Sequence, residues 1–167
     1  MTQSARQANA TVADLLAADF AWAHALNQDN AEALSDMSAG GFATLVARAR
    51  FARVIGPDAA FLLAFDRPPT NASPNFNWFA RRYSGFIYVD RIAVDRAYRR
   101  QGCAKRLYED LFVMASDAGF SHVACEVNAD PPNPTSDAFH AALGFEVVGD
   151  AVLADRGKTV RYYMRTL

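Results

Sequence analysis

The segment from Asp95 to Ala104 places two arginines and a glycine where a strand-like apolar run gives way to a helix-like pattern. Arg99 and Arg100 supply two fixed positive charges, and a guanidinium group suits phosphate oxygens. Gly102 and Ala104 have little or no side chain, so an anion can approach the backbone there. The first turn of a helix also offers unpaired N–H groups and the positive end of the helix dipole. Together these features predict a pyrophosphate site.

A plainer interpretation of the same segment stays open. It would be an ordinary helix start whose glycine allows tight packing and whose two arginines are solvated. A dinucleotide-binding protein of the Rossmann type is disfavoured, because the chain has no Gly-x-Gly-x-x-Gly motif and both arginines precede the glycine.

Hydrophobic periodicity predicts the elements that must position this segment. A strand, a helix of about five turns and a second strand should form a right-handed parallel crossover. The expected elements are a helix over 11–27, a helix over 35–49 interrupted at Gly40 and Gly41, a hairpin of 51–55 and 59–65, a long aromatic connection over 66–84, a strand over 85–94, a helix over 102–118, a strand over 121–127, a short helix over 133–143, and a closing hairpin of 145–153 and 159–164.

Two segments of the chain carry a family resemblance. IAVDRAYRRQGCAKRLYEDL resembles the acetyl-coenzyme A (acetyl-CoA) signature of the GNAT acetyltransferases, whose Arg/Gln-x-x-Gly-x-Gly/Ala core appears as Arg99, Gly102 and Ala104. Downstream, NPTSDAFHAALGF resembles a second family element, with Asn133 and a closing Gly-Phe in the expected spacing. His140 departs from the family pattern, because a tyrosine is frequent at that position.

The resemblance implies one domain over 1–167 with an α/β fold: a mixed, splayed sheet of six to seven strands flanked by helices on both faces. Pantetheine would lie between the strands before and after the signature helix and pair with main-chain groups, and the N–H of Val94 would polarise the thioester carbonyl. The residues expected to bind acetyl-CoA are Ile92, Ala93, Val94, Arg99, Arg100, Gln101, Gly102, Cys103, Ala104, Lys105 and Asn133.

Asp90 and Glu126 are the candidate proton acceptors. An alkyl amine has a pKa of about 10.4, so roughly one molecule in 2,500 is neutral at pH 7 and a base is needed. Strand alternation directs both carboxylates toward the expected gap if the two strands are neighbours. The alternatives are an ion pair of Asp90 with Arg91 or Arg81, and a Glu126 that simply meets water at a strand end.

His140 is the candidate proton donor to the leaving thiolate, because it occupies the position of the family tyrosine. A structural histidine on a short helix is the alternative. Asn133 is likewise expected either to cap that helix or to touch the pantetheine arm, and the two roles are compatible.

Acceptor recognition is expected from segments outside the signature. Trp78 and Tyr83 belong to the aromatic connection, and Asn27 closes the first predicted helix. An aromatic cluster that only anchors the connection, and a polar turn at Asn27, are the alternatives. The acceptor would be a small-molecule or peptide amine. A non-catalytic module that senses CoA is the alternative function.

Composition limits the remaining possibilities. A net charge of -1 argues against a nucleic-acid partner, and the absence of a run of eighteen uncharged apolar residues argues against a membrane partner. Two cysteines, Cys103 and Cys125, favour a reducing cytoplasm over a disulfide framework or zinc cluster. The reaction implies no metal, and the closing hairpin makes a homodimer possible.

Overall fold

A single mixed sheet of seven strands organises the structure, a computed structural model that describes residues 10–167. The strand order is β1-β2-β3-β4-β5-β7-β6, and only β4 and β5 pair in parallel. This confirms the predicted α/β class and strand number. The strands are β1 (Val12–Asp14), β2 (Phe51–Ile55), β3 (Ala60–Phe65), β4 (Phe86–Val94), β5 (His122–Asp130), β6 (Glu146–Leu153) and β7 (Lys158–Thr166).

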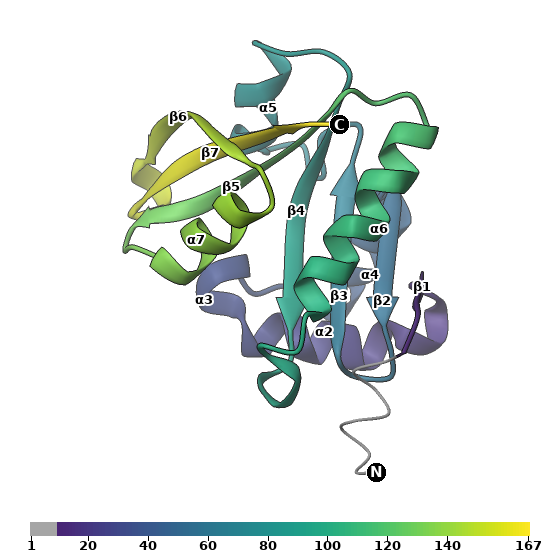
Figure 1. Ribbon diagram of the computed structural model, residues 1–167. Coiled ribbons are helices and arrows are strands. Elements are labelled where there is room, and N and C mark those ends of the chain that lie inside the picture. Colours follow the sequence, from purple (N-terminus) through teal and green to yellow (C-terminus); the bar gives the residue numbers. More distant parts are fainter. Residues whose placement is uncertain (1–9) are drawn as a thin grey trace.

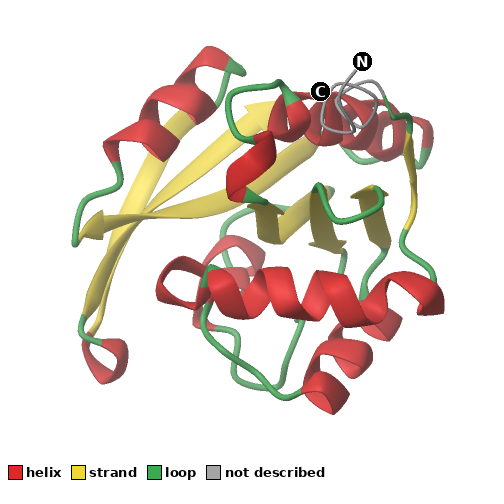
Figure 2. Cartoon of the chain, turned by 90° about the horizontal axis from the view of Figure 1, so that it is seen from below, coloured by secondary structure: helices red, strands yellow, loops and turns green. Residues whose placement is uncertain are grey.

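Helices cover both faces of the sheet, as predicted (Figures 1 and 2). The longest helix, α6, packs on the opposite face from α2 and α4. None of the helices within residues 10–167 is long and apolar enough to cross a membrane. The helices are α2 (Phe20–Asp29), α3 (Ala31–Leu34), α4 (Ala39–Arg48), α5 (Pro74–Ala80), α6 (Cys103–Asp117) and α7 (Pro134–Ala142), with short 3-10 turns η1 (Ala17–Asp19), η2 (Arg96–Tyr98) and η3 (Ala154–Arg156).

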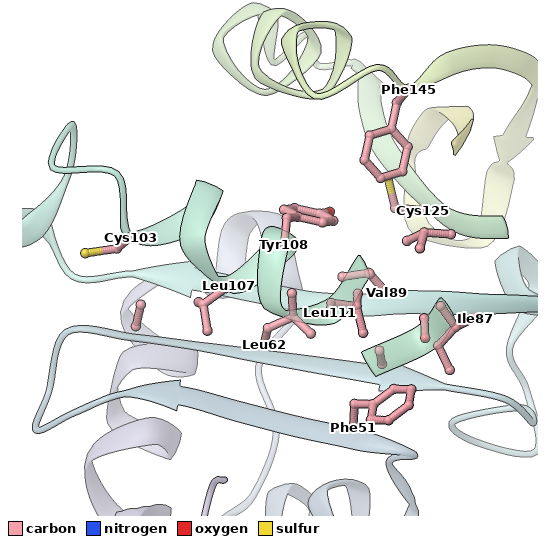
Figure 3. Packing of buried hydrophobic residues seen from close by; sticks show 14 of the residues in the cluster. Phe51, Leu62, Ile87, Val89, Cys103, Leu107, Tyr108, Leu111, Cys125 and Phe145 are labelled. Carbon is pink, nitrogen blue, oxygen red and sulfur yellow. The ribbon is translucent and has the colours of Figure 1, made fainter. Parts of the chain in front are cut away.

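Packing against the sheet fixes the position of α6. Leu107 and Leu111 are fully buried and point onto the strands, near Leu62 of β3 (Figure 3). Full burial of one such leucine contributes about 1.5–3 kcal/mol. Tyr108 instead points toward the side where Cys125 and Phe145 lie, and its ring centroid is 5.5 Å from that of Phe145. These contacts hold α6 against the sheet.

The parallel crossover β4-α6-β5 forms as predicted, but its two strands pair only at their beginnings. The last paired residues are Tyr88 and Ala124. Beyond them β4 and β5 diverge, and β7 pairs with β5 along almost its whole length (Figure 1). The main chain of β4 beyond Val89 therefore has no strand neighbour on the β5 side.

The beginning of the chain does not form the predicted helix over 11–27. Residues Val12–Asp14 form edge strand β1, which pairs with β2, and the helix starts only at Phe20. Three residues of β1 pair with β2 here, and Asp14 also forms an ion pair with Arg53. Tertiary contacts of this kind override local propensity.

Two further predictions at the level of elements are wrong. The helix expected over 35–49 starts later than predicted, because α4 begins after Ser38, whose Oγ accepts a hydrogen bond from the N–H of Gly41 at 3.0 Å. The glycines therefore lie in the first turn of α4 and do not interrupt it. The connection over 66–84 contains α5, which starts with Pro74, a residue suited to the first turn of a helix.

Candidate active site

The divergence of β4 and β5 opens a gap beside the start of α7. The cavity within it, called here the donor gap, has a volume of about 150 Å³. Asn133 and His140 reach it from α7 and the turn before it, and Tyr108 reaches it from α6. The other residues that line it are Ala33, Leu34, Val89, Asp90, Arg91, Ile92, Cys125, Glu126, Val127, Asn128 and Ser136.

Main-chain groups of β4 face this gap at alternate residues. The N–H of Asp95 donates to the carbonyl of Ala59, so the polar groups of Asp95 point toward β3. Alternation along an antiparallel strand then directs those of Ile92 and Val94 toward β5 and those of Ala93 toward β3. Ile92 and Val94 are therefore better placed than Ala93 to pair with an extended ligand in the gap.

The start of α6 lies next to the gap and has the features of an anion site. Gly102 precedes the helix with a φ of +80°, a left-handed conformation that favours glycine. No side chain of the described residues caps the first turn of α6, and a Cβ atom at Gly102 would meet nothing within 4 Å. Open space and N–H groups without a side-chain cap fit a diphosphate.

The side chains around this turn differ in how free they are to bind a phosphate group. Arg99 donates from Nε to the Val94 carbonyl at 3.3 Å and from Nη2 to Asn30 Oδ1 at 3.1 Å, so ligand binding must compete with these bonds. Arg100 is exposed. Gln101 donates to the carbonyl of Ala97 at 2.8 Å, and Lys105 pairs with Glu109 at 3.1 Å. Cys103 is buried, and burial raises the pKa of its thiol, which agrees with a packing role.

A second and larger cavity, of about 380 Å³, lies beyond the donor gap and is called here the acceptor cavity. Asp90, Arg91, Glu126 and Asn128 line both cavities. The two spaces therefore meet at the carboxylates predicted from the sequence. The remaining residues of its lining are Ala33, Leu34, Ser35, Leu45, Pro69, Thr70, Ala72, Ser73, Pro74, Asn75, Tyr88, Leu153, Arg156, Lys158 and Val160.

Glu126 lies at this junction in an environment that favours its neutral form. Burial, and then the nearby charge of Asp90, raise the pKa of Glu126 to about 8. The Tyr88 hydroxyl donates to its Oε2 at 2.6 Å, and the Asn75 side chain also hydrogen-bonds it; both oppose the rise. Glu126 is thus not a carboxylate that simply meets water, and its pKa is close to that of an efficient general base.

Asp90 is engaged differently, because it forms the ion pair with Arg91 that was the alternative to a catalytic role. Arg91 Nε lies 3.1 Å from Asp90 Oδ2. Burial raises the pKa of Asp90, and the charge of Arg91 opposes this. Arg91 also donates to Asn27 Oδ1 at 2.7 Å and to the Ser35 carbonyl at 3.1 Å. Asn27 is fully buried and lines neither cavity, so it can influence an acceptor only through its partners Arg91 and Ser35, to whose carbonyl its Nδ2 donates at 3.2 Å.

Tyr88→Phe tests the hydrogen bond to Glu126. Removing a bond to the charged form disfavours that form, so the pKa of Glu126 rises further. The rate of acetyl transfer should rise with pH as Glu126 ionises. If the bond contributes about 1.4 kcal/mol, this rising part of the pH–rate profile should shift by roughly one pH unit to higher pH. Tyr163→Phe is the matched control, since the Tyr163 hydroxyl donates to Asp137 instead. If the pH–rate profile of Tyr88→Phe does not shift, the hydrogen bond from Tyr88 does not set the pKa of Glu126.

His140 and Tyr108 form a buried pair at the donor gap. His140 Nδ1 lies 2.7 Å from the Ser136 carbonyl oxygen, which only accepts, so Nδ1 carries the hydrogen. Nε2 then accepts a hydrogen bond from the Tyr108 hydroxyl at 2.8 Å. Burial lowers the pKa of His140, so the ring is neutral at pH 7. Tyr108 therefore holds the proton of this pair.

Asn133 forms the expected helix cap, and its contact with pantetheine stays a prediction. Its Oδ1 accepts from the N–H of Ser136 at 3.2 Å and so caps α7, and the residue also lines the donor gap. Trp78 and Tyr83 lie in the aromatic cluster around α5, where Trp78 stacks on Tyr162 with ring centroids 4.2 Å apart. Neither residue lines the donor gap or the acceptor cavity, so the structure matches the anchoring role described as their alternative.

Sequence reasoning missed three residues of the site. Tyr88 has the same strand parity as Asp90, which places it on the same face, but nothing in the sequence marks its hydroxyl as a partner of Glu126. Asn75 lies in α5, which was predicted as irregular chain. Tyr108 was read as part of the signature helix, and only the approach of α7 reveals its contact with His140.

Comparisons with known proteins agree with this geometry. A family model described as "Acetyltransferase (GNAT) family" matches residues 59–145. No curated protein matches the chain significantly. The chain is similar in structure to the ribosomal-protein-S18-alanine N-acetyltransferase from Escherichia coli, with 21% identity, 93% of this chain and 92% of that chain covered, and a TM-score of 0.67.

Two other solved structures show the same fold. Ard1 from Thermoplasma volcanium is 15% identical, with 94% of this chain and 97% of that chain covered and a TM-score of 0.72. Arabidopsis thaliana NAA60 in complex with a bisubstrate analogue is 17% identical, with 93% and 96% covered and a TM-score of 0.69.

Proposed function

Because the chain belongs to the GNAT family of acetyltransferases, we propose that it moves the acetyl group of acetyl-CoA directly to a primary amine within a ternary complex. One observation carries this mechanism: the donor gap and the acceptor cavity meet at Asp90 and Glu126. A thioester lodged between β4 and β5 and an amine entering from the other side would meet there without a covalent enzyme intermediate.

The donor half of the complex uses main-chain groups and charge. The diphosphate binds at the start of α6 around Gly102, with Arg99 and Arg100 adding positive charge. Pantetheine pairs with the main chain of Ile92 and Val94 and passes Asn133. The N–H of Val94 polarises the thioester carbonyl where negative charge develops. Gln101, Cys103, Ala104, Lys105 and Ala93 complete the surroundings of the coenzyme.

The chemical step needs one base and one proton donor. The amine nitrogen attacks the carbonyl carbon, and ionised Glu126 accepts the proton that the nitrogen loses, directly or through water. With a pKa of about 8, about a tenth of Glu126 is ionised at pH 7. When the C–S bond breaks, the Tyr108 hydroxyl, held until then by His140 Nε2, transfers its proton to the departing thiolate, and the phenolate left behind regains a proton from water. Asp90 acts on Glu126 through its charge.

His140→Phe tests this donor pair. The variant removes the acceptor that holds the Tyr108 hydroxyl in position for proton transfer. We therefore expect kcat to fall about tenfold to a hundredfold while the Kd for acetyl-CoA changes much less. Tyr108→Phe should have a similar effect, and the double variant should add little. Steady-state kinetics, with calorimetry for binding, measure both quantities. Unchanged rates across pH 6–9 in His140→Phe would overturn the role.

Ligand binding and turnover test the proposed function as a whole. Thermal shift with acetyl-CoA, CoA, ATP and NAD should show stabilisation by the first two alone. Thiol release over a panel of amines should then show turnover with at least one of them. Tight acetyl-CoA binding without any release would instead favour a CoA-sensing module.

Peptide N-termini belong in the amine panel, since one similar structure is a ribosomal-protein-alanine N-acetyltransferase. Location in a reducing cytoplasm stays a prediction, supported by two buried, free cysteines. A homodimer, and the absence of nucleic-acid and membrane partners, also stay predictions.

A further inference from the structure

We propose that the acceptor is a small primary amine that also carries an anionic group, and that Arg156 and Lys158 bind this group in the acceptor cavity. The inference rests on the proposed function and specifies the acceptor of the same site. Its basis is the unequal distribution of charge along the lining of that cavity.

Three cationic side chains and two carboxylates line the acceptor cavity. Arg91 is compensated by its ion pair with Asp90 at 3.1 Å. Neither Arg156 nor Lys158 forms a salt bridge with a carboxylate anywhere in residues 10–167. Two cations of the cavity therefore lack a carboxylate partner.

The remaining carboxylate does not balance these charges at neutral pH. Since the pKa of Glu126 is raised to about 8, most Glu126 is neutral at pH 7. The cavity then carries a positive charge that attracts an anion. The same charge disfavours the ammonium form of a bound amine and so favours the neutral form that attacks the thioester.

Arg156 and Lys158 are both placed to face an acceptor. Arg156 ends η3, Lys158 begins β7, and Leu34 and Ser35, at the end of α3, contribute to the same lining. The Lys158 ammonium donates one bond to the Glu32 carbonyl at 2.7 Å, which ties this wall to α3 and leaves its other N–H groups for a ligand. Among the described residues, none hydrogen-bonds the Arg156 guanidinium, whose charge, like that of Arg91, opposes the rise in the pKa of Asp90.

The size of the cavity favours a small acceptor. Its volume of about 380 Å³ lies within the range of small-molecule sites, about 300–1,000 Å³. A carboxylate or a phosphate would satisfy Arg156 equally, because a guanidinium forms paired hydrogen bonds with either. The shared chemistry is an anion linked to a primary amine.

Matched acceptor pairs test the inference. The probes are 4-aminobutyrate against n-butylamine, and 2-aminoethyl phosphate against n-propylamine, with thiol release as the readout. We expect kcat/KM to be at least about tenfold higher for the anionic member of at least one pair. The pair with the larger ratio of kcat/KM, anionic over neutral, shows whether a carboxylate or a phosphate is the preferred group.

Arg156→Ala should remove most of this preference by raising KM for the anionic amine about tenfold, while neutral amines change less than about twofold. Arg156→Lys should restore part of it. Arg81→Ala is the matched control, since Arg81 is exposed and lines neither cavity. If the neutral amines are acetylated as fast as the anionic amines or faster, this inference is overturned, and the proposed function is not. The same holds if a peptide with an amidated C-terminus and no acidic side chain is acetylated at its N-terminus as fast as the anionic amines. Release from no amine at all contradicts the proposed function as well.

Discussion

Glu126→Gln should lower kcat by about a hundredfold or more and remove the rising limb of activity near pH 8. Glutamine keeps the size and polarity of the side chain but cannot accept the proton of the amine, and general-base catalysis contributes about 10²–10⁴-fold. The wild-type limb should lie near the pKa of about 8 that burial and Asp90 impose on Glu126. The measurement is kcat/KM against pH with a saturating concentration of acetyl-CoA.

Stability should report the same carboxyl group independently of turnover. The folded protein keeps Glu126 protonated up to about pH 8, whereas the ordinary pKa is 4.5. Between these values the folded state binds more protons than the unfolded state. The contribution of this group to the free energy of unfolding therefore falls as pH rises through that window, and Glu126→Gln removes this slope.

Two comparisons make the Glu126 result decisive. Glu146→Gln changes the same group at an exposed position of β6 and should leave both profiles unchanged. Asp90→Asn removes a negative charge that raises the pKa of Glu126. The rising part of the pH–rate profile of this variant should therefore shift to lower pH. If Asp90→Asn abolishes turnover and Glu126→Gln remains active with its limb intact, the base is Asp90.

Gly102→Asp should weaken acetyl-CoA binding by about thirtyfold or more. The new carboxylate has the same sign as the diphosphate and competes for the N–H groups at the start of α6, a change of about 2 kcal/mol in binding free energy. Calorimetric titration with acetyl-CoA measures this change. Thermal unfolding of the same sample shows how much of the loss comes from folding.

Gly119→Asp is a closely matched control for the Gly102 variant. Gly119 follows the other end of α6 with a φ of +87°, and a Cβ atom there would also meet nothing within 4 Å. Left-handed strain should therefore cost both variants roughly 1 kcal/mol of stability. Equal acetyl-CoA affinities in the two variants would show that the diphosphate does not bind at Gly102.

The local structure proposed to bind the coenzyme could be predicted from the sequence because its information is local. Gly102 needs a left-handed backbone, the helix after it has an amphipathic pattern, and both lie between two apolar strands. These are contacts between near neighbours in the chain, so residue type and spacing suffice to indicate them. The same is true of the β2–β3 hairpin and of the β4-α6-β5 crossover.

The acceptor side could be predicted only in part. Asp90 and Glu126 were found through strand alternation, which needs no knowledge of the rest of the fold. Their pKa values, and the contacts of Glu126 with Tyr88 and Asn75, depend on α5 and on burial. Trp78 shows the opposite case, because its residue type suggested an acceptor contact while its packing on Tyr162 keeps it outside the acceptor cavity.

The amino-acid sequence alone indicated the order of most elements, the glycine turn before α6, and the two carboxylates on adjacent strands. Only the folded chain shows that Val12–Asp14 form an edge strand, that Tyr108 and His140 form a buried hydrogen-bonded pair, and that Arg156 and Lys158 line the same cavity as the two carboxylates. The physical reason is the range of the interactions. Backbone conformation and periodicity act over a few residues, whereas desolvation and charge pairing depend on groups that only the complete fold brings together.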